Sequence, residues 1–107
     1  MSSWIEVGKL EDIPRLGSRV VEMGSSEIAI FRTDKDDTFA VANKCPHKGG
    51  PLADGIVHGK RVTCPLHNWT IDLESGEAVA PDKGCARHFD TRVEAGVVWL
   101  NSAVSYF

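Results

Sequence analysis

Short stretches rich in apolar residues recur along this chain, and turn-forming residues separate them. Such stretches are typical of β-strands, and no stretch keeps the period of an amphipathic helix. In the first half, the pattern predicts strands at residues 4–7, 19–23, 27–32 and 38–42. The residues between them predict a proline-ended turn at 10–14, a hairpin turn at 24–26 and a polar loop at 34–37.

The second half continues the same pattern. Residues 56–58 and 61–63 flank Gly59-Lys60, and glycine in the first position of a two-residue loop favours a type II′ hairpin turn. Further on, the pattern predicts a strand at 69–73, a turn at 74–77, a returning segment at 86–93, a turn at 94–96 and a last strand at 97–100. Regularly spaced short strands of this kind predict an all-β sandwich or barrel.

Two of the connecting loops carry candidate metal ligands. Cys45 and His47 lie in one loop and Cys64 and His67 in the other, so each offers one thiol and one imidazole. Thiolate suits iron–sulfur centres, zinc and Cu(I), and imidazole suits zinc, copper and iron, so the residue types leave the metal open. Zinc sites usually pair like ligands within each segment. One cysteine and one histidine per loop instead fit a dinuclear centre with both cysteines on one iron and both histidines on the other.

The spacing Cys-x-His-x16-Cys-x-x-His resembles that of Rieske [2Fe–2S] domains, and the resemblance extends from about Trp4 to Leu100. It implies a single domain over residues 1–107, with an antiparallel β sandwich or barrel base and a small cluster-binding subdomain inserted in it. The base would comprise about residues 1–43 and 82–107, and the subdomain about 44–81. The resemblance also implies a Rieske-type [2Fe–2S] cluster with Cys45, His47, Cys64 and His67 as its ligands.

Length and charge narrow the possible functions. A chain of 107 residues has the size of one domain, so a second catalytic domain has no room. The net charge is -3 and no basic run occurs, which argues against nucleic acid or an anionic membrane surface as a partner. No apolar run approaches the roughly 20 residues that span a bilayer, and no signal-peptide pattern is visible, so we expect a cytoplasmic protein.

The remaining cysteine and histidines receive simpler interpretations. With Cys45 and Cys64 taken as ligands, Cys85 has no partner, so no disulfide framework is expected. We expect His58 and His88 to be surface or packing residues, because the two loops already supply four ligands.

The run from Cys64 to Ala78 resembles the small subunit of NAD(P)H-dependent assimilatory nitrite reductase. That resemblance implies a large partner subunit carrying FAD, sirohaem and a [4Fe–4S] cluster. It also implies reduction of nitrite to ammonium during nitrate assimilation. The chain would relay electrons or support the complex, and would be a subunit of an oxidoreductase rather than a complete enzyme.

Two other functions fit the same residues. A Rieske ferredoxin of an aromatic-ring-hydroxylating dioxygenase, working between a flavoprotein reductase and an oxygenase, has the same size and cluster. A non-redox interaction module is the other, because a metal site can supply much of the folding free energy of a small domain. The chain contains no Ser/His/Asp set, phosphate-binding glycine loop or dinucleotide fingerprint, so we expect no catalytic residue in it.

Overall fold

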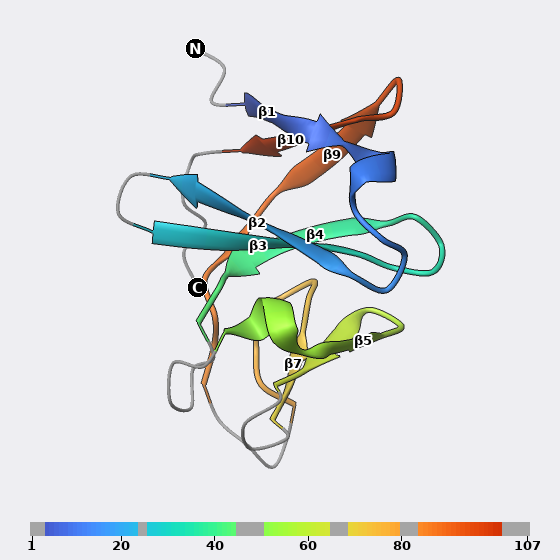
Figure 1. The fold of residues 1–107 in the computed structure, drawn as a ribbon. Coiled ribbons are helices and arrows are strands. Elements are labelled where there is room, and N and C mark those ends of the chain that lie inside the picture. The colour runs from blue at the N-terminus through green and yellow to red at the C-terminus, as the bar shows by residue number, and fades with distance from the viewer. Residues whose placement is uncertain (1–3, 24–25, 45–50, 65–68, 80–83, 102–107) are drawn as a thin grey trace.

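The computed structural model describes residues 4–23, 26–44, 51–64, 69–79 and 84–101, and the structural statements below concern these residues (Figure 1). They form short strands and two single-turn 3-10 helices, η1 (Leu10–Asp12) and η2 (Leu52–Asp54), with no α-helix among them. No helix within the described ranges is long and apolar enough to cross a membrane. The strands are β1 (Trp4–Lys9), β2 (Ser18–Met23), β3 (Ser26–Arg32), β4 (Thr38–Ala42), β5 (Ile56–His58), β6 (Arg61–Thr63), β7 (Thr70–Asp72), β8 (His88–Phe89), β9 (Thr91–Glu94) and β10 (Val97–Asn101).

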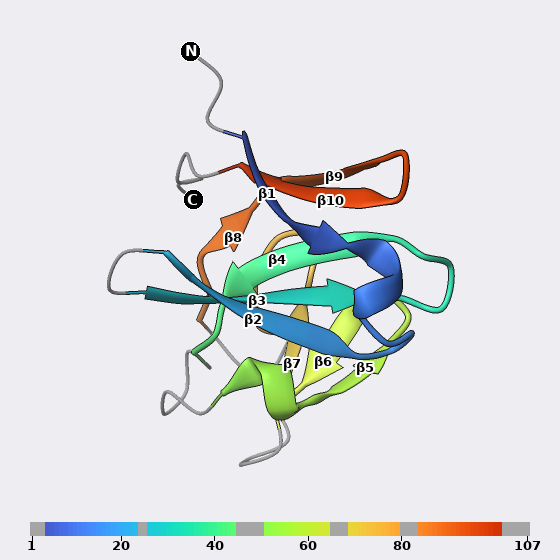
Figure 2. The ribbon, with the colours of Figure 1, turned by 45° about the horizontal axis from the view of Figure 1, so that its top comes forward.

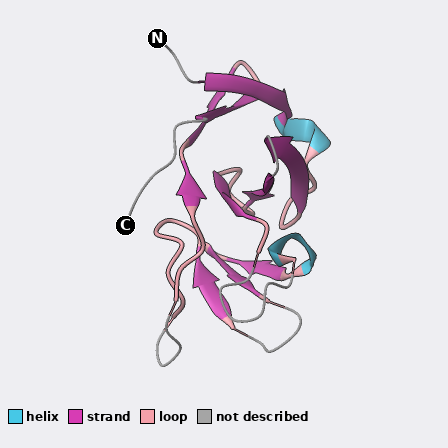
Figure 3. Cartoon of the chain, turned by 90° about the vertical axis from the view of Figure 1, so that its left-hand side faces the viewer, coloured by secondary structure: helices cyan, strands magenta, loops and turns pink. Residues whose placement is uncertain are grey.

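These strands form three antiparallel sheets. The first has the order β1-β10-β9, the second β2-β3-β4-β8 and the third β5-β6-β7. Figures 1 and 2 show the second sheet in the middle, with the first on one side of it and the third on the other. The side view in Figure 3 shows the same succession of layers. The predicted all-β fold is confirmed.

The inner strands of the middle sheet, β3 and β4, are buried on both faces, and β3 shows this residue by residue. Ile28 and Ile30 belong to the apolar cluster that faces the first sheet. Ala29 and Phe31 belong to the cluster that faces the third sheet. Because successive side chains of a strand point to opposite faces, a strand between two layers needs apolar residues at every position. This explains the unbroken run Ile-Ala-Ile-Phe.

Each outer layer supplies its own apolar side chains to the middle sheet. Val98 and Leu100 of β10 pack in the cluster with Ile28 and Ile30. From the third sheet and its flanks come Leu52, Val57, Val62, Cys64, Ile71 and Leu73, which pack in the cluster with Ala29 and Phe31. Burial of one large aliphatic or aromatic side chain contributes about 1.5–3 kcal/mol to the free energy of folding. The buried side chains of each outer layer therefore stabilise its packing on the middle sheet.

The predicted turns within the described residues are confirmed, whereas residues 24 and 25 of the predicted hairpin turn at 24–26 lie outside them. Gly59 has a φ of +58°, whereas Lys60 is not among the described residues with positive φ, which fits the type II′ turn. Ala95 and Gly96 both have positive φ, at +51° and +76°, as a type I′ turn requires. The predicted turn at 10–14 contains the 3-10 helix η1. The predicted division into base and inserted subdomain stays a prediction.

The returning segment 86–93 differs from the continuous return that the pattern predicts. It divides at Asp90 into β8, which pairs with β4 in the middle sheet, and β9, which pairs with β10 in the first sheet. The backbone carbonyl of Asp90 accepts a hydrogen bond from Asn101 N at 2.9 Å. The chain changes sheets here, and local alternation carries no information about which sheet a strand joins.

Gly76 offers a test of this architecture. It has a φ of +79° in the turn after β7, and a Cβ built on it would lie against the carbonyl oxygen of Ala86, closer than any real contact. We expect Gly76→Ala to lower the free energy of unfolding by about 3 kcal/mol or more, measured by urea denaturation.

Gly59→Ala is the matched control. Gly59 also has positive φ, but no atom lies within 4 Å of a Cβ at that position. At Gly59 only the positive φ is unfavourable for alanine, so we expect the free energy of unfolding to fall by about 1–2 kcal/mol. Equal losses for the two variants would contradict the close packing of the Gly76 turn against Ala86.

Candidate metal centre

Cys64 is the one candidate ligand within the described residues. It follows β6 directly, and its backbone N–H donates to the carbonyl oxygen of Trp69 at 2.7 Å, next to the last β6-β7 pair, Thr63 with Thr70. Residues 65–68 therefore begin and end at adjoining points of one hairpin. The Cys64 side chain is 1% exposed and lies in the same apolar cluster as Leu52. The hairpin thus holds a buried thiol at the start of the second predicted ligand loop.

The other three predicted ligands, Cys45, His47 and His67, lie outside the described residues. Cys64 and Cys85 are both free cysteines, the first buried and the second exposed. His58 lies on the exposed side of β5 and His88 is half-buried in β8, as expected for residues that are not ligands. No group of three or more His, Cys, Asp or Glu side chains within the described ranges could hold a metal ion.

Asn43 fixes both ends of the first predicted ligand loop. It follows β4, and its backbone N–H donates to the carbonyl oxygen of Glu27 at 2.9 Å. Its side-chain Oδ1 accepts a hydrogen bond from the backbone N–H of Ala53 at 2.8 Å, and its Nδ2 donates to Glu27 Oε1 at 3.2 Å. Ala53 is also held by Ser18, whose Oγ donates to its carbonyl oxygen at 2.9 Å. One side chain therefore connects the residues on either side of 45–50.

Sequence reasoning missed Asn43. The signal that could have found it is its place at the end of a strand, two residues before Cys45. An Asn side chain in a loop commonly bonds to backbone groups nearby. The partner, however, lies 10 residues further on, and no local pattern specifies a bond of that range.

A third pair of ends is fixed in a similar way. Val79 N donates to the carbonyl oxygen of Thr70, and Ala78 N donates to that of Gly84, both at 2.8 Å. Residues 80–83 therefore also begin and end at hydrogen-bonded points. Because β5 begins opposite Thr63 and β7 begins at Thr70, the ends of all three segments gather at one end of the third sheet.

A row of hydrogen bonds runs across the outward face of this sheet. His58 Nε2 lies 2.7 Å from Thr63 Oγ1, and Thr63 Oγ1 lies 3.2 Å from Thr70 Oγ1. On the inward face, Trp69 is partly buried against the same apolar cluster as Cys64. Hydrogen bonds on the outward face and apolar packing on the inward face therefore stabilise the β6-β7 hairpin next to Cys64.

The donor chemistry fits an iron–sulfur centre. A thiol that forms no disulfide and is shielded from solvent is suited to bind iron as the thiolate, since a hydrophobic surrounding limits solvent access to a cluster. The hydrogen bonds of Asn43 and Cys64 also keep the ends of the two predicted ligand loops at the same end of the third sheet. A centre with ligands from both loops requires this. A small iron–sulfur protein is the class that this β fold and the buried, free thiol of Cys64 fit.

Comparison with known families agrees. The family model described as Rieske [2Fe-2S] domain matches residues 3–91. The chain belongs to the Rieske [2Fe–2S] domain family. Its cofactor is a Rieske-type [2Fe–2S] cluster, and its function is electron transfer.

One curated relative is the ferredoxin component of the naphthalene 1,2-dioxygenase/salicylate 5-hydroxylase systems of Ralstonia sp. It is 31% identical over 77 residues, which are 72% of this chain and 73% of the relative. In two other curated relatives the match spans only 18% and 17% of a longer chain.

Solved structures of related size share the fold. A chain in the complex of reduced oxygenase and oxidized ferredoxin of carbazole 1,9a-dioxygenase has a TM-score of 0.87 at 21% identity, with all of both chains covered. A putative NADH-dependent nitrite reductase small subunit from Mycobacterium tuberculosis has a TM-score of 0.84 at 19% identity, covering 100% of this chain and 98% of that one. The E. coli protein NirD has a TM-score of 0.81 at 28% identity, covering 94% and 96%.

The role of Asn43 can be tested by removing its side-chain acceptor. Asn43→Ala leaves the partly buried Ala53 N–H without its partner, so we expect a loss of about 1–3 kcal/mol in the free energy of unfolding. We also expect less iron per chain after purification, because the ends of residues 45–50 are no longer connected.

Glu27→Ala is the control for that variant. It removes only the exposed bond between Asn43 Nδ2 and Glu27 Oε1 and keeps the bond to Ala53. We expect it to change stability by about 0.5 kcal/mol or less and to leave the iron content unchanged. A Glu27→Ala protein as depleted in iron as Asn43→Ala would contradict the assignment.

Proposed function

We propose that this chain is the Rieske small subunit of an assimilatory NAD(P)H-dependent nitrite reductase. The observation that carries the proposal is the correspondence with NirD, at 28% identity over nearly the full length of both chains. The run from Cys64 to Ala78, which resembles such subunits, lies in the same matched region. The partner is then the large flavin and sirohaem subunit, and the site of action is the cytoplasm.

The ligands in this proposal are Cys45, His47, Cys64 and His67. The placement of Cys64 at the end of β6, buried and without a disulfide, supports its part in the set. The cluster supplies one-electron exchange. Neutral imidazoles in place of two thiolates make the site less negative, which places Rieske potentials at about -150 to +300 mV against about -400 mV for plant-type ferredoxins.

A ferredoxin of an aromatic-ring dioxygenase is the second candidate. It is favoured by the 31% identity with the ferredoxin component from Ralstonia sp, which is higher than the identity with NirD but covers less of this chain. Size and fold are the same in both cases, so only the partner separates them.

Substitution of the cysteines tests the ligand set. We expect Cys64→Ser and Cys45→Ser each to abolish the visible absorption of the cluster and to lower iron to well below two atoms per chain, because a serine hydroxyl is a poor ligand for this centre. Cys85→Ser is the control, since Cys85 is exposed and not in the set. Full cluster content in Cys64→Ser would contradict the assignment.

Reconstitution with the partner tests the function. The chain is added to the large nitrite reductase subunit of the same organism, and NAD(P)H oxidation that depends on nitrite is measured. We expect the wild-type chain to increase this rate. Cys64→Ser separates the two roles. If this chain without cluster still gives the full increase, the wild-type chain acts as structural support; if it binds the large subunit but gives no increase, the wild-type chain acts as an electron relay.

The contradicting outcome is equally direct. A chain that neither binds the large subunit nor changes its rate, yet supports turnover of a ring-hydroxylating oxygenase with its reductase, would replace the proposal with the ferredoxin.

A further inference from the structure

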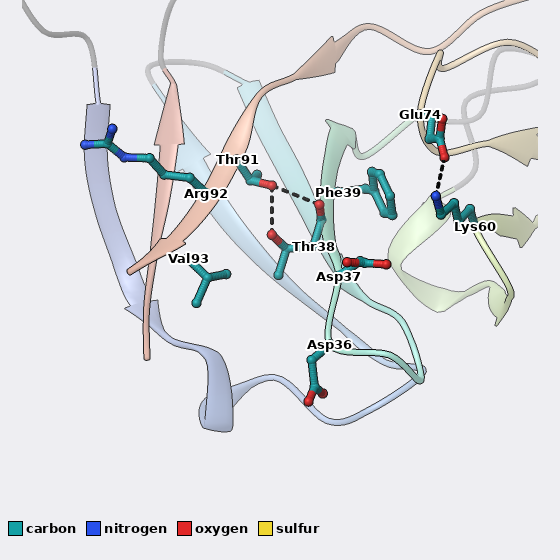
Figure 4. Close-up of a pocket in the computed structure, with 9 residues that line it drawn as sticks. All are labelled: Asp36, Asp37, Thr38, Phe39, Lys60, Glu74, Thr91, Arg92 and Val93. Atoms are coloured by element: carbon teal, nitrogen blue, oxygen red, sulfur yellow. Dashed lines mark hydrogen bonds and ion pairs between the residues drawn. The ribbon is translucent and has the colours of Figure 1, made fainter. Parts of the chain in front are cut away.

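A groove separates the strands of the first and middle sheets from the two turns of the third sheet (Figure 4). One wall comes from the start of β4, with Phe39, and from β9, with Val93; the other comes from Lys60 and Glu74. The groove has a volume of about 370 Å³, and a second hollow of about 280 Å³ shares Phe39 and Glu74 with it. Both volumes are large enough for one long side chain.

The groove lies away from the predicted cluster ligands. Lys60 belongs to the turn between β5 and β6, whereas Cys64 follows the opposite end of β6. Glu74 follows the end of β7 that is distant from Trp69. A side chain bound here lies at the end of β6 opposite to Cys64.

The two hydroxyl groups between the walls of the groove already have hydrogen-bond partners within the chain. Thr38 and Thr91 form a hydrogen bond between their hydroxyls at 2.8 Å, and Thr91 Oγ1 also donates to the carbonyl oxygen of Thr38 at 2.9 Å (Figure 4). Beside them lie the ring of Phe39, which is partly buried against the core, and Val93, which is 37% exposed. This surface suits the aliphatic part of a side chain.

Two carboxylates at the rim have no ion-pair partner among the described residues. The exposed carboxylates of Asp37, in the groove, and Asp90, in the adjoining hollow, form no ion pair with any residue that the structure describes. Asp36, by contrast, lies 3.1 Å from Arg15 Nε and 2.8 Å from Arg32 NH2. Hydrogen bonds from these two guanidinium groups lower the pKa of Asp36.

The chain already places one cation at this rim. Lys60 Nζ lies 2.8 Å from Glu74 Oε1, and the pKa of Lys60 is raised mainly by Glu74 and further by Asp37 and Asp72. The other basic residue of the wall, Arg92, points away from the groove (Figure 4). Its guanidinium lies 4.6 Å from the centre of the Trp4 ring. The acidic rim therefore favours a further positive charge.

We propose that this groove receives a lysine or arginine side chain of the large nitrite reductase subunit. Its aliphatic part packs on Phe39 and Val93, and its cationic head lies at Asp37, with Asp90 of the adjoining hollow adding negative charge. This inference rests on the proposed function and adds an anchoring contact separate from the surface where electrons enter or leave. Charge pairs at such contacts mainly set the orientation and rate of association.

Charge reversal tests the proposal. Binding of the large subunit to the cluster-loaded Asp37→Lys/Asp90→Lys chain is measured by calorimetry at low and high salt. We expect the dissociation constant to rise about tenfold or more and its salt dependence to weaken, while the cluster's absorption and EPR spectra stay unchanged. The milder Asp37→Asn/Asp90→Asn chain should show an intermediate rise.

The control is Asp12→Lys/Asp34→Lys, which makes the same change in net charge at two exposed residues outside both hollows. We expect its dissociation constant to stay within about threefold of wild type.

Four results would overturn the proposal. Unchanged binding of the Asp37→Lys/Asp90→Lys chain would exclude the groove and leave the proposed function intact. Equal weakening by the control would mean that net charge alone acts. A wild-type dimer that the groove variant abolishes would assign the groove to a second copy of this chain. A wild-type chain with no affinity for the large subunit would refute the proposed function together with this contact.

Discussion

The burial of the inner strands β3 and β4 on both faces of the middle sheet is the constraint on which the rest of the structure depends. In β3, Ile28 and Ile30 pack toward the first sheet, and Ala29 and Phe31 toward the third. Neither outer sheet has more than three strands, and sheets of that size need a packed face for stability. The layer that delivers Cys64 is therefore stable because it shares its core with β3.

The cluster-binding end of the molecule adds hydrogen bonds to this packing. Asn43 connects the residues on either side of 45–50, Cys64 bonds to Trp69 across 65–68, and Ala78 bonds to Gly84 across 80–83. These hydrogen bonds join described residues on either side of each segment, so they add to the apolar packing that holds this end of the third sheet.

The sequence was informative where one residue type has one physical use. The short apolar run of β3 between turn residues predicted a strand, Gly59 predicted the hairpin turn, and the Cys-x-His and Cys-x-x-His loops pointed to the cluster. It was uninformative where the partner is distant. The division of 86–93 at Asp90 depends on which sheet each half joins, and the groove combines residues from four separate segments. Tertiary packing decides such features.

Low-temperature EPR of anaerobically purified, dithionite-reduced protein, with iron and zinc quantified on the same sample, is the first test of whether this chain carries a Rieske [2Fe–2S] cluster. A bound Rieske cluster gives a rhombic signal whose average g value lies below that of the free electron, so we expect this signal together with about two irons per chain. A colourless protein with stoichiometric zinc and no such signal would contradict it and would leave a metal-stabilised interaction module in its place.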